Sequence, residues 1–422
     1  MFERYIQESN IRGYFRNPLY KNSYYMLLTS IVTSIASFLF WIIAARFYSV
    51  NEVGLATTLI SAITFVAGFS TLGFNWGIIR FLPNEENKKD MVNSCLVVTA
   101  ISTIGLSIIF ISSAHIFSPA LTFLSSELLI SLSFIIFTAL VSLLEFQKRF
   151  FLASRKADYA CLQSLLNNTL KILIILCALS LGTFGIFFSW GLSAAVAFCF
   201  ALFFLIPRTL TGYSPSIQFN LPSISKLFHF SFGNYIAENL WALPRNLLPL
   251  IIISLLSTEM TAYFYISWSV ANILFLIPMM FSASLVVEGS YSQENFRATS
   301  ICAIKSTLML LLPAILAMIL FGRDVLAIFG EEYAENAYLL LSILALSSIP
   351  LTFVEFFVSV QRVWKNIKAI IIYYGLIAVI ALSMTYLLIP QIGIIGVGIG
   401  WLAAQTIIAI IQGLQIRREM RN

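Results

Sequence analysis

Apolar stretches of about 20 residues recur along almost the whole chain and alternate with short polar segments. A helix needs about 20 mostly apolar residues to cross the roughly 30 Å hydrocarbon core of a bilayer. The pattern therefore predicts an all-α polytopic membrane protein with about twelve transmembrane helices. The predicted helices lie at residues 22–44, 54–78, 92–113, 127–147, 158–181, 183–206, 228–255, 262–287, 301–321, 337–360, 368–389 and 392–414.

Composition agrees with this pattern. Hydrophobic residues make up 59% of the chain and charged residues 10%, and the mean hydropathy is +0.91. A soluble domain with such a surface would aggregate. The net charge of +6 comes from short basic clusters between apolar spans, so we predict no nucleic-acid partner. The five cysteines have no paired spacing, and two histidines are too few to form a cluster that binds zinc. The sequence therefore predicts neither a metal site nor a cofactor.

The basic clusters also predict the orientation in the membrane. They lie before the first predicted helix, in every second connection and after the last helix, whereas the opposite side has little beyond Arg46 and Arg323. Lys and Arg are enriched in the cytoplasmic loops of membrane proteins. We therefore expect a multi-pass protein of the cell (plasma) membrane with both termini in the cytoplasm.

The longest polar connection divides the chain into two halves. It is rich in Pro and Ser, follows the sixth helix, and predicts a linker. The halves echo one another, because SVNEVGLA at 49–56 and STEMTAYF at 257–264 each form a polar turn with a Glu before a helix. The predicted domains are a cytoplasmic basic tail (1–21), an N-terminal six-helix bundle (22–206), a cytoplasmic linker (207–226), a C-terminal six-helix bundle (227–414) and a cytoplasmic tail (415–422).

The seventh predicted helix contains charges inside its apolar span. Asn234, Glu238, Trp241 and Arg245 recur at i, i+4, i+7 and i+11, which places them on one face of a helix. An ionisable side chain in hydrocarbon costs at least about 2.5–3.5 kcal/mol and normally faces protein or water. This face is therefore expected to line a cavity, unless Arg245 and Glu238 form an ion pair that only holds helices together. For Glu238 the alternatives are a counter-ion of Arg245, a site for a coupling proton or sodium ion, and a helix–helix contact.

The fifth helix has a similar polar face. Gln163, Asn167 and Lys171 recur at i, i+4 and i+8. Both helices start in the cytoplasm, and Lys171 and Arg245 then lie roughly 20–25 Å above that start at 1.5 Å per residue. They are expected to face each other across a central cavity. The alternative is that Lys171 pairs with a carbonyl or a carboxylate and serves only helix association.

Three further charges lie near helix ends. Arg46, at the outer end of the first helix, either attracts a substrate headgroup or extends to the interface, as long basic side chains do. Glu145 and Glu355 lie near the cytoplasmic ends of the fourth and tenth helices, beside basic residues. They are candidates for interfacial ion pairs or for an inner gate.

Four segments resemble a known family. They are NSYYMLLTSIVTSIASFLFWIIAARFYSVNEVGLATTLIS, STLGFNWGIIRFLP at 70–83, VLAIFGEEYAENAYLLLSILALSSIP at 325–350 and GIIGVGIGWLAAQTIIAIIQ at 393–412. In these the chain is similar to the polysaccharide transporter family of Wzx-type O-antigen and oligosaccharide flippases, in the multidrug/oligosaccharidyl-lipid/polysaccharide (MOP) exporter superfamily. The resemblance implies a MOP/MATE-like fold, with two six-helix bundles around a central cavity, and a transporter rather than an enzyme.

The resemblance implies a flippase for a polyprenol- or dolichol-(pyro)phosphate-linked oligosaccharide. Ammonium and guanidinium groups bind phosphate, and Trp241 would stack on a sugar. The partners of the protein would be this substrate, membrane lipids and polysaccharide-assembly proteins. A cation-coupled multidrug or small-molecule antiporter of the same superfamily is the alternative, and a polysaccharide polymerase or ligase a more distant one. The sequence leaves the coupling ion, Na⁺ or H⁺, open.

Overall fold

The computed structural model describes residues 18–117, 121–217, 219–291 and 296–419. These residues form α-helices with short 3-10 and π-helical turns, and no strand occurs among them. The predicted N-terminal tail lies almost entirely outside the described residues, as does the end of the C-terminal tail. The all-α fold class is confirmed.

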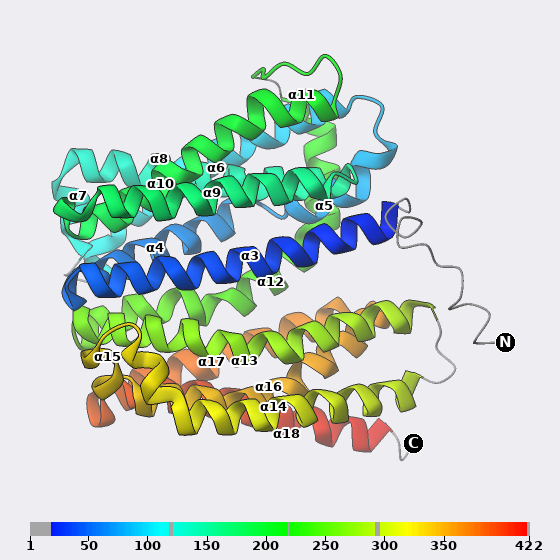
Figure 1. Ribbon diagram of the computed structural model, residues 1–422. Coiled ribbons are helices and arrows are strands. Elements are labelled where there is room, and N and C mark those ends of the chain that lie inside the picture. Colours follow the sequence, from blue (N-terminus) through cyan, green and yellow to red (C-terminus); the bar gives the residue numbers. More distant parts are fainter. Residues whose placement is uncertain (1–17, 118–120, 218, 292–295, 420–422) are drawn as a thin grey trace, which may run out of the picture. The chain divides into compact units, whose positions relative to one another are not determined.

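Among the described residues, eleven helices are long and apolar enough to span a membrane. The remaining predicted span, the seventh, lies in α12 (Leu221–Leu255), whose 35 residues extend about 52 Å and so exceed the length of a membrane crossing. About twelve membrane helices therefore fit the structure, as predicted. The other long helices (Figure 1) are α3 (Pro18–Phe47), α4 (Val50–Ser70), α6 (Lys88–Phe117), α8 (Leu128–Ala153), α9 (Ala157–Cys177), α10 (Thr183–Phe200), α13 (Thr258–Tyr291), α14 (Phe296–Ala327), α16 (Tyr338–Val363), α17 (Ile367–Ile392) and α18 (Ile395–Glu419).

One predicted helix differs from the structure. The span expected at 54–78 is divided into α4 and a short helix α5 (Phe74–Phe81). Gly73 separates them with φ 79°, a left-handed backbone conformation that glycine adopts without steric cost. The remaining short elements are η1 (Leu82–Asn84), α7 (Phe123–Ser126), η3 (Leu179–Leu181), η4 (Ala201–Leu205), α11 (Ile206–Thr209) and α15 (Glu331–Asn336).

The linker predicted at 207–226 is shorter in the structure and is fastened to α6. Helix α11 includes its first residues and α12 begins at Leu221. Between them, the Tyr213 hydroxyl donates a hydrogen bond to Asn93 Oδ1 at 2.6 Å, and Asn93 Nδ2 donates to the Ser214 carbonyl at 3.1 Å. The Asn220 amide donates to Ser94 Oγ at 2.9 Å. These bonds hold both ends of the segment on one helix.

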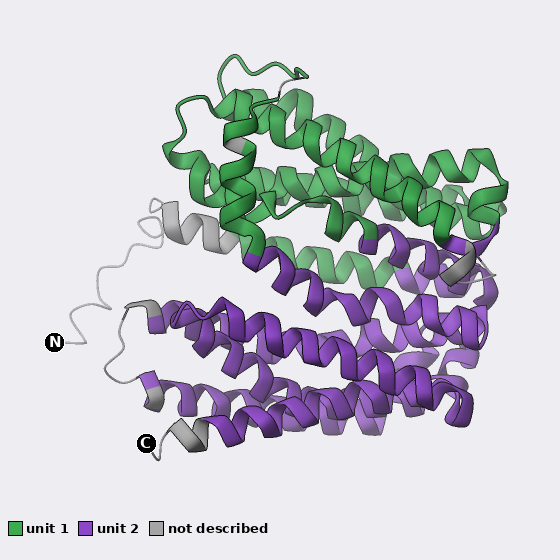
Figure 2. Ribbon diagram, turned by 180° about the vertical axis from the view of Figure 1, so that it is seen from behind, with its two compact units in different colours: residues 1–40, 66–113, 123–232 green, residues 41–65, 114–122, 233–422 purple. Residues whose placement is uncertain are grey.

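The chain forms two compact units (Figure 2). Unit 1 contains residues 1–40, 66–113 and 123–232, and unit 2 contains residues 41–65, 114–122 and 233–422. The chain passes between the units inside α3, α4, α6 and α12 and just before α7, so the units differ from the two parts of the chain on either side of the linker. The division into two six-helix bundles stays a prediction.

Unit 1 has a core in which the start of α12 packs on α5. Leu227 is fully buried with Phe74 and Ile78 in this core. Gly77 permits the close approach, because a Cβ there would lie 2.4 Å from Leu227 Cδ2 and 2.9 Å from Ser231 Oγ. The first turns of α12 thus belong to unit 1, although the rest of the helix belongs to unit 2.

In unit 2, the two segments that echo each other in the sequence lie in contact. Thr258 Oγ1 donates to Asn51 Oδ1 at 2.5 Å, and Asn51 Nδ2 donates to Glu259 Oε1 at 3.1 Å. A Cβ on Gly54 would lie 1.8 Å from the Thr258 carbonyl oxygen. The start of α4 is therefore locked against the start of α13.

Candidate functional site

The four polar and aromatic residues predicted to share a face all lie on α12 in unit 2. Glu238 and Arg245 have exposed side chains, whereas Asn234 and Trp241 are half-buried. Arg245 forms no ion pair with Glu238 or with any other residue in the part of the chain that the structure describes. The phenol of Tyr265 is near enough to interact with its guanidinium electrostatically. Arg245 therefore retains its positive charge for another partner.

Trp241 belongs to an aromatic cluster inside unit 2. Its ring centroid lies 4.9 Å from that of Tyr374 on α17 and 6.1 Å from that of Trp401 on α18. Trp401 lies 5.0 Å from Trp268 on α13. Trp268, Trp401 and Tyr374 are buried, so the cluster fixes the half-buried indole of Trp241 beside the charged residues of α12.

Lys171 lies on α9 in unit 1 between two aromatic rings. Its Nζ is 5.1 Å from the ring centroid of Trp190 on α10 and 5.7 Å from that of Phe40 on α3. A cation over an aromatic face is attracted by the ring quadrupole, more strongly where water is excluded. The aromatic rings thus stabilise the half-buried ammonium group without a carboxylate in direct contact. The alternative in which Lys171 forms an ion pair would require such a contact.

Two charged residues of α8 complete the surroundings of Lys171. The Nζ of Lys148 lies 2.6 Å from Glu145 Oε1, one turn away on the same helix. Both Lys148 and Glu145 interact with Lys171 electrostatically. This Lys171 site, composed of Lys148, Lys171 and Glu145, carries two ammonium groups and one carboxylate, and its charge suits an anion.

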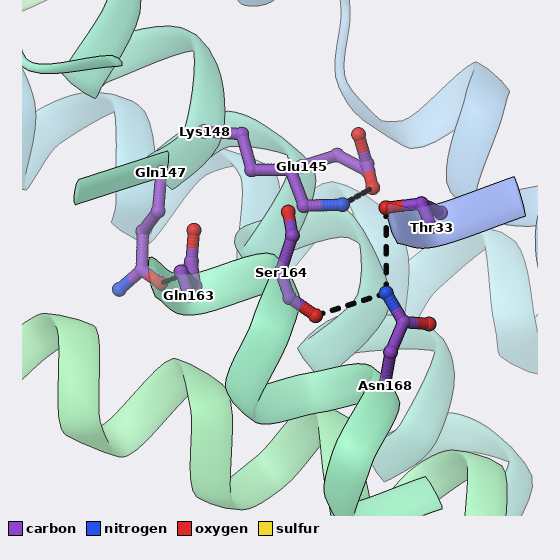
Figure 3. Close-up of polar contacts among 7 residues, drawn as sticks. All are labelled: Thr33, Glu145, Gln147, Lys148, Gln163, Ser164 and Asn168. Atoms are coloured by element: carbon purple, nitrogen blue, oxygen red, sulfur yellow. Dashed lines mark hydrogen bonds and ion pairs between the residues drawn. The ribbon is translucent and has the colours of Figure 1, made fainter. Parts of the chain in front are cut away.

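The other predicted residues of α9 have distinct surroundings. Gln163 is buried, and its Nε2 donates to Gln147 Oε1 at 2.6 Å. Asn167 has a buried Oδ1 with no hydrogen-bond partner among the described residues. Figure 3 shows Gln147 and Gln163 at the left of the close-up, and the pair of Lys148 and Glu145 in its upper centre. Gln163 therefore joins α9 to α8, whereas Asn167 has an acceptor still to be satisfied.

Several residues of this region were not identified from the sequence. Asn168 Nδ2 donates to Thr33 Oγ1 at 3.3 Å and to the Ser164 carbonyl at 2.9 Å, and so ties α9 to α3 (Figure 3). Phe40 and Trp190 form the aromatic surroundings of Lys171. Periodicity within one helix gives no signal for such residues, because they come from other helices.

Arg46 and Glu355, both in unit 2, have protein partners. Arg46 Nε donates to the Ile328 carbonyl at 2.7 Å and Nη2 to the Ala327 carbonyl at 2.6 Å. A cation there satisfies free carbonyls and complements the dipole at the C-terminal end of α14. The buried Glu355 carboxylate has Tyr374 as hydrogen-bond partner and Arg362 as charge partner. A headgroup contact of Arg46, and gates at Glu145 and Glu355, stay predictions.

The described side chains include no group of three or more His, Cys, Asp or Glu that could hold a metal ion. The site residues instead offer cations and aromatic faces in both units. Lys171 and Lys148 provide ammonium groups in unit 1, and Arg245 provides a guanidinium in unit 2. Such groups bind phosphate or carboxylate, the guanidinium through its planar fork of donors.

The fold matches solved transporters over more than nine-tenths of the chain. A multidrug resistance MATE family transporter of the MOP superfamily, in an inward-facing conformation, has a TM-score of 0.72 and 16% identity, over 92% of this chain and 94% of that chain. A MOP superfamily transporter from Pyrococcus furiosus, reported for the reverse polarity of its binding pocket, has a TM-score of 0.66 and 15% identity, over 96% and 95%. The protein therefore has the fold of a multi-pass MOP-superfamily transporter.

A match to a family model identifies the family within this superfamily. Residues 19–288 match the family model described as polysaccharide biosynthesis protein. The chain belongs to this family, that of the Wzx-type flippases, as its resemblance predicted. No curated protein matches the sequence.

Proposed function

We propose that this transporter is a flippase for a polyprenol- or dolichol-(pyro)phosphate-linked oligosaccharide. It moves the substrate from the cytoplasmic to the external leaflet by alternating access, for the synthesis of a surface polysaccharide or glycan. Its location is the plasma membrane with both termini in the cytoplasm. The family supports the polysaccharide pathway, and the Lys171 site is the observation that carries the substrate assignment.

The chemistry of the substrate fits this site. A phosphate or pyrophosphate must cross the hydrocarbon core, where an unpaired charge is costly. Lys171 lies inside a membrane-spanning helix, and the charged side chains that act on it among the described residues are Lys148 and the carboxylate of Glu145. Charge-assisted hydrogen bonds from ammonium to phosphate are about twice as strong as neutral ones. The site thus favours an anionic headgroup over a cationic drug.

Arg245 and the aromatic rings extend the proposal to the sugar. The guanidinium of Arg245 has no ion pair among the described residues and would bind phosphate oxygens in unit 2. Trp241 and Trp190 offer ring faces on which a sugar would stack, since aromatic side chains combine an apolar face with polar edges.

A cation-coupled small-molecule antiporter is the second candidate. Glu355 favours it, because this carboxylate is 6% exposed and its Oε1 has no hydrogen-bond partner among the described residues. A buried carboxylate of this kind would suit Na⁺ or H⁺ coupling. The same group would equally couple an ion to flipping, so the substrate, not the ion, separates the two functions.

The test is transport in proteoliposomes that contain the purified full chain. Lys171→Glu and Arg245→Glu are expected to lower the flipping of a lipid-linked oligosaccharide at least about tenfold, because a lost charge-assisted contact is worth about 1.5–3 kcal/mol. Arg323→Gln, an exposed basic residue of α14, is the matched control and is expected to flip normally. Normal flipping by both glutamate variants would refute the proposal, and drug efflux driven by a cation gradient would favour the antiporter.

A further inference from the structure

Glu145 is the one member of the Lys171 site whose charge opposes an anionic substrate. Its carboxylate contacts Lys148 at 2.6 Å and also interacts electrostatically with Arg149 and Lys171. It lies inside α8, about 12 Å before the end of that helix at 1.5 Å per residue. A carboxylate that serves only to fix helix orientation would not need a position beside two ammonium groups in the membrane span.

We infer that Glu145 is a built-in competitor of the substrate's anion. It offsets part of the positive charge of Lys148 and Lys171 while no substrate is bound, and the phosphate or pyrophosphate replaces it. This inference rests on the proposed function, because it requires the Lys171 site to bind the phosphate. Glu145 thereby weakens binding and helps release, which a transporter needs as much as capture.

The geometry allows this exchange. The side chain of Glu145 is 49% exposed and that of Lys148 is 25% exposed, so the carboxylate can turn away without breaking a packed core. Exposed ion pairs between residues three or four apart are worth less than about 1 kcal/mol. A phosphate that binds both ammonium groups gains more than that. Displacement is therefore favourable, although it lowers the net affinity.

The competition also provides selectivity. A bulk phospholipid carries a phosphodiester with a single charge, and it gains little when it exchanges with a singly charged carboxylate. An anion with more than one charge interacts more strongly with two ammonium groups at the same distance. Glu145 should thus keep the abundant phospholipids of the cytoplasmic leaflet out of the site.

The experiment measures the binding of farnesyl diphosphate, a short-chain probe, to the full chain in nanodiscs, with phosphatidylglycerol as competitor. Glu145→Gln keeps the shape of the side chain and removes its charge. It is expected to bind the probe about threefold to tenfold more tightly and to be inhibited by phosphatidylglycerol at lower concentration, because the singly charged lipid no longer meets a resident carboxylate. Glu331→Gln, an exposed carboxylate of α15 in unit 2, is the control and is expected to bind like the wild type.

Two further variants separate the possible failures. Lys171→Gln is expected to weaken binding of the probe at least about tenfold, and Glu145→Asp, which shortens the side chain, to lie between the wild type and Glu145→Gln. If Lys171→Gln weakens binding while Glu145→Gln and Glu145→Asp bind no more tightly than the wild type, the competitor role is wrong and the proposed function stands. If Lys171→Gln binds the probe normally, the phosphate site itself is wrong.

Discussion

The basic residues inside the membrane spans have partners that depend on their surroundings. Lys171 has two aromatic rings, Arg46 has two backbone carbonyls, and Arg245 has the neighbouring phenol of Tyr265. The two carbonyls occupy two N–H donors of Arg46, whereas an aromatic face leaves the N–H donors of a cation available. Of these residues, Lys171 and Arg245 therefore suit a passing anion, and Arg46 suits a structural role.

Replacement of Arg46 should lower stability. Arg46→Ala removes two charge-assisted hydrogen bonds to the carbonyls at the end of α14. We expect the free energy of unfolding to fall by about 1–3 kcal/mol. The loss should be seen as a lower Tm in detergent. Arg46→Lys retains the charge and one donor and should lose less. An unchanged Tm for Arg46→Ala would show that the two bonds contribute nothing to stability.

At the residue scale, the sequence predicts which side chains share a helix face but not what that face meets. Asn234, Glu238, Trp241 and Arg245 lie on one continuous helix as expected. Gln163 fits the same kind of pattern, yet it donates to Gln147 of the neighbouring helix. Helical periodicity holds within one element, whereas the partner across the interface depends on which helices pack together, and that information is not local.

The helices themselves follow from apolar length, and their ends follow from local backbone chemistry. Most predicted spans agree with observed helices to within a few residues, because a bilayer crossing requires a fixed length of apolar chain. The span at 54–78 ends early, since Gly73 adopts a left-handed conformation. Helix α12 begins earlier than predicted, because Leu221–Phe232 pack in unit 1 instead of extending the linker.

The contact between α4 and α13 makes Gly54 sensitive to substitution. Gly54→Ala would place a Cβ 1.8 Å from the Thr258 carbonyl oxygen, and the two helix ends would have to separate. We expect the free energy of unfolding to fall by about 1–3 kcal/mol, as at other overpacked sites. Thermal unfolding measures this change. Gly105→Ala in α6 is the matched control, because nothing lies within 4 Å of its added Cβ. An equal Tm for the two variants would contradict the close contact.

The linker should loosen at alkaline pH. Burial raises the pKa of Tyr213, outside the membrane spans, from 10.0 to about 12. Its neutral form is therefore favoured in the folded state, and this stabilisation is complete below pH 10 and is lost as the pH rises towards 12. A spin label at Thr211, a residue of the linker, should become more mobile over that range. In Tyr213→Phe, which lacks the ionisable hydroxyl and its bond to Asn93, mobility should be higher at neutral pH and should show no such transition.

On the scale of the whole molecule, the two compact units differ from the two halves of the sequence. The last residues of α3 and the first part of α4 belong to unit 2, together with most of the C-terminal half. The linker marks the midpoint of the chain by its polar composition, but composition reports exposure to water rather than packing. For this reason the count of helices could be predicted from the sequence, whereas the partition into units could not.

The basic clusters make a prediction about topology. We expect reporters fused to the N-terminus and to the C-terminus to be active on the cytoplasmic side, because about twelve spans return the chain to its starting side and the clusters follow the positive-inside pattern. A label at Glu331 in α15 should react from outside the cell. Labelling of Glu331→Cys only after the membrane is permeabilised would overturn the assigned orientation.

The contact between the two echoing segments also bears on the origin of the protein. Position 51 in the first segment corresponds to position 259 in the second, and Asn51 donates to Glu259 across a separation of 208 residues in the sequence. If the segments are equivalent members of a duplicated unit, a residue that touches its own counterpart lies on the pseudo-twofold axis that relates the copies. In an ancestral dimer of single copies, this position would have met itself across the symmetry axis, and after gene fusion the two copies were free to diverge into an amide and a carboxylate that bind each other.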